Sequence, residues 1–206
     1  MKNSLLLGAV GAAALVAVVA AAVPDVAEAG GSQLVRFDRG AMQPVYSTTG
    51  GKGTTNYVLD YKVTNVGAKD VRPRIRLELR TETSKTYGDV YDAATWTAAT
   101  KLLARKAEPS TTAAIRAADL ASGASADGLA NFGAIDPNAD NFQVRVYGIW
   151  DPVFRDRQGR TWMENRVLVL SYSRSGDEYD RQLDPIRLDS AKEELEGEPI
   201  QLHAAK

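Results

Sequence analysis

The chain has 206 residues, with 25 Lys and Arg against 26 Asp and Glu, and it contains no cysteine. This balanced charge gives no long-range attraction toward nucleic acid or anionic lipid, so we expect neither as a partner. Without cysteine the chain has no disulfides, no cysteine nucleophile and no zinc site of the His/Cys kind. The single histidine, His203, lies near the C-terminus, away from the fixed partner and sheltered pocket that a catalytic histidine needs.

The N-terminal segment has the features of an export signal. Lys2 is followed by an uncharged apolar run from Leu5 to Val23, and residues 27–29 then give the small-x-small pattern that signal peptidase reads. We predict a signal peptide over residues 1–29, cleaved after Ala29, and an exported protein in the periplasm or outside the cell. The alternative is a retained membrane anchor from Leu5 to Val23. Eight of its 19 residues are Ala and two are Gly, so the run is only weakly hydrophobic.

Cleavage would leave 177 residues (206 − 29), which is enough for one domain and too few for two domains of ordinary size. The mature charge balances at 24 basic residues (25 − 1) and 24 acidic residues (26 − 2). Without disulfides, packing must hold the domain together. We predict one β-domain over residues 30–188, followed by a polar, flexible C-terminal tail over residues 189–206.

The strongest pattern in the chain is the alternation of apolar and polar residues. It begins with a short strand over residues 34–37 and is clear in "YVLDYKV", residues 57–63, and in "VRPRIRLELR", residues 71–80. A half-buried strand separates two faces in this way, whereas a helix would spread them around its circumference. With the turn "TNVG" between them, these segments predict an antiparallel hairpin. Pro73 cannot donate to a ladder, so it belongs at a strand start or on an unpaired edge.

Further along, residues 85–90, 142–147, 166–174 and 185–188 are also predicted as strands. One segment breaks the rhythm, because residues 93–121 are rich in alanine. There we predict a partly helical excursion over a sheet edge, with a short helix capped by Ser110 and stopped at Gly123. Seven or eight short alternating strands with polar turns favour a single antiparallel β-sandwich.

The stretch "FGAIDPNADNF" contains the best candidate for a metal site. Asp136, Asn138 and Asp140 occupy every second position, as in the opening of an EF-type calcium loop. That loop also needs glycine at its sixth position and glutamate at its twelfth, where this chain has Asn141 and Tyr147. A turn rich in Asp and Asn accounts for the same residues, so we predict a turn here. The alternative is a calcium-stabilised module, and we predict no other cofactor.

A row of arginines follows one face of the strand over residues 71–80. Arg74, Arg76 and Arg80, together with Arg72, are candidates for binding an anionic polymer, but Glu78 interrupts the row. With a net charge near zero, we predict a solvated sheet face and keep an anion-binding face as the alternative.

Carboxylates are the remaining candidates for catalysis, since glycosidases use two acids that flank the bond being cut. The segment "GDEYD" offers Asp177, Glu178 and Asp180, and Glu164 precedes it. Alternation places Asp177 and Glu178 on opposite sides of an extended chain, so they do not converge. We assign no catalytic residue, and a carboxylate-dependent hydrolase of envelope polysaccharide is the alternative function.

Two stretches carry a family resemblance. "YVLDYKVTNVGAKDV" resembles the opening of immunoglobulin-like domains in bacterial lipoproteins and secreted antigens, where a strand ends in Asn-x-Gly. "DLASGASADGLANFGAIDP" is similar to their later element, with Leu120, Gly123, Gly128 and Phe132 at the matching positions. The continuation is similar to exported proteins of planctomycete type.

This resemblance covers residues 57–180. It implies an immunoglobulin-like β-sandwich of seven or eight strands that serves binding or assembly, and it carries over no catalytic residue. We therefore expect a non-enzymatic interaction module of the cell envelope or the extracellular space, with another envelope or extracellular protein as its partner.

Overall fold

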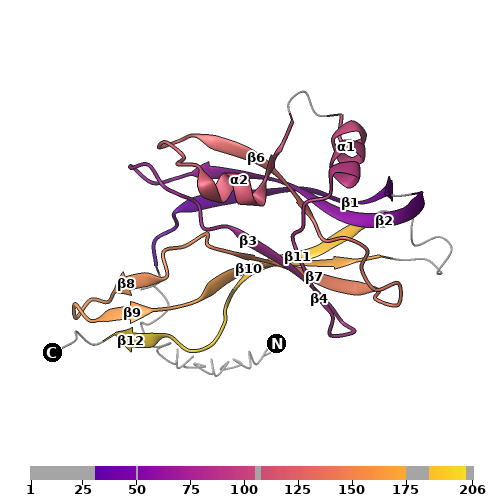
Figure 1. Ribbon diagram of the computed structural model, residues 1–206. Helices are drawn as coiled ribbons and strands as arrows, with labels where there is room; N and C mark the ends of the chain where they lie inside the picture. Colours follow the sequence, from indigo (N-terminus) through magenta and orange to yellow (C-terminus); the bar gives the residue numbers. More distant parts are fainter. Residues whose placement is uncertain (1–30, 50, 105–107, 175–185, 203–206) are drawn as a thin grey trace, which may run out of the picture.

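The structure is a computed structural model that describes residues 31–49, 51–104, 108–174 and 186–202 (Figure 1). Within these ranges the chain is mainly β, with twelve strands in three mostly antiparallel sheets and two short helices. None of the described helices is long and apolar enough to cross a membrane. The predicted leader, the acids of "GDEYD" and His203 lie outside the described residues.

The two larger sheets contain nine of the strands. The four-stranded sheet has the order β1 (Val35–Thr49), β2 (Lys52–Asn65), β6 (Ser125–Asn131) and β5 (Ser110–Thr111). The five-stranded sheet has the order β11 (Arg187–Leu195), β10 (Arg166–Ser173), β7 (Asn141–Tyr147), β3 (Arg76–Thr81) and β4 (Thr86–Gly88). Only the short pairing of β5 with β6 is parallel among the strand pairs described.

The main core lies between these two sheets, and both contribute to it. Leu59 and Val63 of β2 belong to the same buried cluster as Leu79 of β3 and Val144 of β7. The predicted alternation of β3 is confirmed, since its inward residues are buried and its arginines lie on the other side. Removing this apolar surface from water is the main stabilising contribution to such a fold.

The predicted hairpin between residues 57–63 and 71–80 is wrong. β2 pairs with β1 and β6, whereas β3 pairs with β4 and β7 in the other sheet. The turn after β2 does form, since the Asn65 side chain accepts from the backbone of Gly67 (2.9 Å) and donates to the carbonyl of Leu120 (2.8 Å). Val71 then bridges to Leu120, and this contact carries the chain across to the second sheet.

The Ala-rich region contains two helices rather than one. α1 (Ala93–Leu102) packs Trp96 and Ala99 against Val45 and Val58 on the outer face of the four-stranded sheet. That cover explains why β2 is buried on both faces. α2 (Thr112–Ala117) is capped by Thr111, whose side chain accepts from the backbone N–H of Ala114, and not by the predicted Ser110, which lies one residue too early.

The third sheet has the order β12 (Ile200–Leu202), β9 (Thr161–Met163) and β8 (Val153–Arg155). In the chain, β7 leads into β8, β9 into β10, and β11 into β12. The third sheet therefore continues three neighbouring strands of the five-stranded sheet in the same order. It projects from one end of that sheet, at the lower left of Figure 1.

The tail predicted from residue 189 differs from the structure, because β11 runs to Leu195 and β12 follows. Polar side chains do not prevent this pairing, since the ladder uses backbone groups and the charges find partners. Glu194 lies 3.5 Å from Arg145, and Glu196 accepts from Asn165 (2.8 Å). The predicted number of seven or eight strands is therefore too low, because it leaves out the strands of the third sheet, including β12.

Candidate functional site

The stretch around Asp136 forms a turn, as predicted. One carboxylate oxygen of Asp136 accepts from the backbone N–H of Asn138 (3.0 Å), and the other accepts from the Thr83 hydroxyl (2.8 Å) and lies 2.9 Å from Lys85 Nζ. The interaction with Lys85, together with the bonds from Asn138 and Thr83, lowers the pKa of Asp136 to about 2. The carboxylate thus already has three donors from the protein itself.

A buried arginine completes this turn. Arg174 is 5% exposed and donates from Nε to the carbonyl of Ala139 (2.7 Å) and from Nη2 to the carbonyl of Asp136 (2.6 Å). Its Nη1 donates to the hydroxyl of Tyr57. The loop carbonyls that a calcium ion would need therefore face a guanidinium. No group of three or more His, Cys, Asp or Glu side chains suited to a metal occurs in the described parts of the chain.

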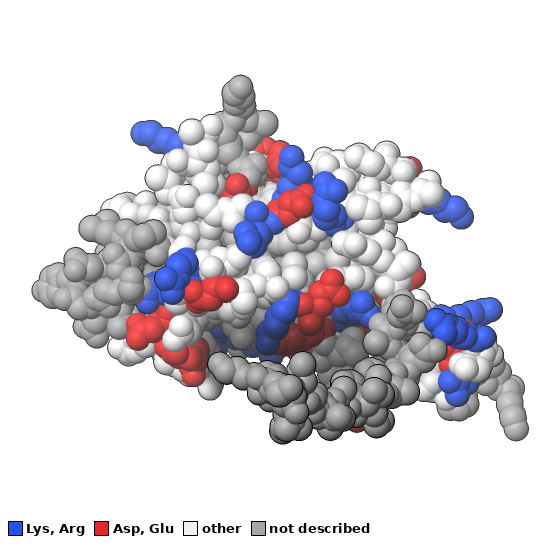
Figure 2. Space-filling view, turned by 180° about the vertical axis from the view of Figure 1, so that it is seen from behind, with Lys and Arg blue, Asp and Glu red and all other residues white. Residues whose placement is uncertain are grey.

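The arginine row lies on the outer face of the five-stranded sheet and is interspersed with acids. Glu78 forms ion pairs with both Arg76 (3.0 Å) and Arg80, and Arg80 also lies 3.6 Å from Glu196. Partial burial raises the pKa of Glu78, but the hydrogen bonds and the positive charges of Arg80 and Arg76 outweigh this effect, so the pKa is lowered. Arg74 lies two residues before Arg76 on the same face and is exposed. The row is thus a network of mixed charge, as Figure 2 shows more widely for the surface seen from behind.

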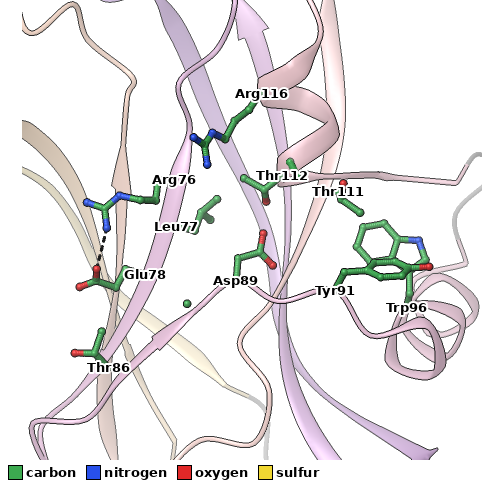
Figure 3. A pocket seen from close by; sticks show the side chains of 12 residues that line it. Arg76, Leu77, Glu78, Thr86, Asp89, Tyr91, Trp96, Thr111, Thr112 and Arg116 are labelled. Carbon is green, nitrogen blue, oxygen red and sulfur yellow. Dashed lines mark hydrogen bonds and ion pairs between the residues drawn. The ribbon is translucent and has the colours of Figure 1, made fainter.

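A pocket of about 600 Å³ opens on the side of the molecule where the edge strands β4 and β5 of the two large sheets face each other. Five segments line it: β3, β4, the loop that leads to α1, α1 itself, and β5 with α2. Its residues are Arg76, Leu77, Glu78, Thr86, Gly88, Asp89, Tyr91, Trp96, Thr111, Thr112, Ala113 and Arg116 (Figure 3).

Two aromatic rings form one wall of this pocket. Asp92 caps α1 by accepting from the backbone N–H of Thr95 (2.7 Å), which places Tyr91 just before the cap and Trp96 four positions after it. An apolar contact between these two positions is a hydrophobic staple. The ring centroids lie 5.6 Å apart. Trp96 is buried, but Tyr91 is 66% exposed, so the staple holds an aromatic ring that remains open to solvent.

Asp89 stands opposite these rings. Burial raises the pKa of its carboxyl group, against the opposing effect of hydrogen bonds from Thr112 and from the backbone N–H of Asn131. The bond from Asn131 measures 2.8 Å. The Thr112 hydroxyl also meets the hydroxyl of Tyr61 at 2.7 Å, and burial raises the pKa of Tyr61, which stays protonated. Hydroxyl and carboxyl groups thus form a connected set at the pocket floor.

The two carboxylates of the pocket do not converge. In Figure 3, Glu78 turns toward Arg76 on one side of β3, whereas Asp89 points toward Thr112. Glu164, an acid considered from the sequence, is buried and lies 3.1 Å from Arg166. A pair of acids that flanks one bond, as glycosidases require, is therefore not formed by these groups.

The third sheet presents a second notable surface. The ladder places Val153, Met163 and Ile200 side by side, and Leu202 follows on the same face. Their exposed fractions are 42%, 40%, 57% and 39%, whereas no residue of this sheet belongs to a buried core cluster. We call these four residues the apolar row. Contiguous exposed apolar surface of this kind marks interaction sites.

Sequence reasoning missed both surfaces. The short strands of the apolar row carry too few residues to display a period of two. The staple of Tyr91 and Trp96 around Asp92 was readable as a capping pattern, but its position beside Asp89 depends on the fold. Comparisons with protein-family models, with curated proteins and with solved structures found no match.

Proposed function

We propose that the protein is a non-enzymatic, exported interaction module that binds another protein of the envelope or the extracellular space. The apolar row carries this proposal, because it places four large apolar side chains side by side on an uncovered sheet face. A central apolar patch with a polar rim is the usual composition of a protein interface.

The rim indicates the chemistry of the partner. Arg155 lies on the same face as the apolar row, paired in the ladder with Thr161, and Arg157 and Arg160 follow in the β8–β9 turn. Arg160 is paired with Asp156 (2.6 Å), so residues 155–160, with three arginines and one acid, keep a net positive charge. Figure 2 shows Lys and Arg side chains gathered at the lower right, where this hairpin lies. We therefore infer a partner whose contact surface is apolar at its centre and acidic at its edge, which also orients the encounter.

Two further features support a binding role. The acids of the pocket do not converge, which speaks against the alternative of a carboxylate-dependent hydrolase. Two large sheets that share one core are compatible with an immunoglobulin-like sandwich, and we keep that finer description, with the exported location, as part of the proposal. Such a sandwich presents its binding surfaces at its edges and ends.

The test compares two apolar side chains of matched exposure. Ile200 in the row is 57% exposed, and Leu102 at the end of α1 is 55% exposed. The mature protein and its Ile200→Asp and Leu102→Asp variants are used as bait for the envelope fraction, and each captured protein is then purified and its Kd measured. We expect one acidic-rimmed partner that binds the wild type and Leu102→Asp equally, and Ile200→Asp at least tenfold more weakly.

Salt provides an independent check, because the arginine rim should make the association rate fall as ionic strength rises. A partner that binds Ile200→Asp as well as it binds the wild type would refute the proposal. So would a self-association, measured by light scattering, that Ile200→Asp abolishes, because the row would then be covered by a second copy of the chain.

A further inference from the structure

We propose that the pocket between β4 and β5 is a binding site for an uncharged oligosaccharide, separate from the apolar row. Sugar rings combine an apolar face with a periphery of hydroxyl groups, and a site for them needs an aromatic surface beside a set of hydrogen-bonding groups. The pocket has both.

The aromatic surface is Tyr91. Its ring rests on Trp96 through the staple of α1 and remains 66% exposed. An exposed ring that is already fixed loses little conformational entropy when a ligand covers it, so stacking against it is favourable. The cap at Asp92 and the burial of Trp96 thus hold Tyr91 in place before any ligand arrives.

The hydrogen-bonding groups come from the loop before α1, from β5 and from α2. Asp89 supplies a carboxyl group, Thr111 supplies a hydroxyl that also caps α2, and Arg116 extends from α2 toward the same space (Figure 3). Both donors and acceptors are therefore present, as a ligand rich in hydroxyl groups requires. Thr112 is itself fixed by the buried hydroxyl of Tyr61.

Charge selects against ionic ligands. Two cations, Arg76 and Arg116, and two acids, Glu78 and Asp89, line the pocket, so their formal charges cancel. A strongly anionic or cationic ligand would meet as many like charges as opposite ones. An uncharged polar chain meets no such repulsion.

An extended peptide is the competing occupant, and the backbone at this place argues against it. A peptide that joins a sheet edge needs backbone donors there. Here the N–H of Val90 donates to the carbonyl of Asn131 (2.8 Å), and the N–H of Asn131 donates to Asp89. The backbone N–H groups of this loop are thus already bonded, and the two edge strands that line the pocket, β4 and β5, have only three and two residues, which is a short edge for an added strand.

The test is isothermal titration of the full chain with cellohexaose, chitohexaose, xylohexaose, mannohexaose and maltohexaose. We expect at least one of them to bind. Tyr91→Leu keeps the apolar contact with Trp96 but removes the flat ring, and it should weaken that binding at least tenfold, about 1.4 kcal/mol. Tyr91→Phe should keep the affinity within about threefold of the wild type.

Matched controls separate this site from the rest of the surface. Tyr46 is also 66% exposed and lies outside the pocket, so Tyr46→Leu should leave sugar binding unchanged. Ile200→Asp should leave it unchanged as well, so that failure of the sugar site and failure of the apolar row are distinguishable. Binding of none of the five sugars, or equal binding by Tyr91→Leu and the wild type, overturns the inference. A ligand of this pocket that proves to be a peptide overturns it too.

Discussion

The five-stranded sheet and the third sheet are formed by strands that follow one another in the chain, but their apolar side chains have different surroundings. Along β7 and β10, Val144 and Leu170 are buried because the four-stranded sheet lies over them. In β8, which follows β7, and in β9, which precedes β10, Val153 and Met163 lie on a sheet face that is exposed to solvent. Apolar side chains in a strand therefore indicate a contact. In the five-stranded sheet the contact is with the four-stranded sheet, and in the third sheet we propose that it is with another molecule.

The largest expected effect is in stability, and the same substitution can be made in both regions. Ile75 is fully buried, so Ile75→Ala should lower the free energy of unfolding by about 2–5 kcal/mol through lost burial and the cavity left behind. Ile200→Ala should change it by less than about 0.5 kcal/mol. Urea denaturation measures both, and similar values for the two variants would contradict the distinction between the regions.

The next effect concerns the arginine that holds the turn at the end of the core. Arg174→Met should lower the free energy of unfolding by about 3 kcal/mol, because it removes the guanidinium donors to the carbonyl of Ala139 and to the hydroxyl of Tyr57 and one of the two donors to the carbonyl of Asp136. Arg187→Met is the control, since that side chain is 80% exposed and should matter little. A melting temperature of Arg174→Met equal to that of the control would show that the guanidinium is not structural.

A smaller effect concerns pH and belongs to the third sheet. Although partial burial opposes it, hydrogen bonds from the Trp162 indole and from Arg160 lower the pKa of Asp156 to about 2. Since this lies below the ordinary value of 3.8, the carboxylate stabilises the hairpin above pH 3.8, and that contribution is lost as the pH falls through about 2.

The Trp162 indole N–H lies 2.9 Å from the Asp156 carboxylate and reports this titration in an NMR spectrum. Its resonance should move with a midpoint near pH 2, and it should be shifted at neutral pH in Asp156→Asn. A midpoint at or above 3.8 would mean that the turn does not hold the carboxylate as described.

The smallest expected effect is that of calcium. Because Lys85 and Arg174 already supply positive charge to the turn at Asp136, millimolar calcium should leave the melting temperature of the protein unchanged. Thermal melts with calcium and with a chelator measure this. A rise with calcium that Asp136→Asn abolishes would restore the calcium-stabilised module.

The longer alternating strands were predictable from this sequence, whereas the short strands of the third sheet, the full length of β1 (Val35–Thr49) and the pairing of the strands were not. The alternation of β3 is set by its own residues, which must separate a core face from a solvent face. The strand with which β3 pairs is determined by contacts between residues far apart in the sequence, such as the bridge of Val71 with Leu120. No local pattern in the sequence encodes this pairing. The predicted hairpin failed for this reason.

The candidate site was predictable only in part. The turn at Asp136 was found because Asx residues bond to their own backbone, which is a local property. The buried partner of that turn, Arg174, lies 38 residues further along the chain and could not be inferred from the spacing. The pocket brings residues 76 to 116 together from two sheets and two helices, so its composition follows from the tertiary fold alone.

The continuity of β7, β10 and β11 into β8, β9 and β12 has a mechanical consequence. Three covalent connections join the third sheet to adjacent strands of one ladder, and Gly148, with a φ of 79°, lies at one of these junctions. A pull on anything attached to the small sheet would be distributed over three neighbouring strands at once. Movement of the projecting end is thus coupled to three strands together and not to one strand alone.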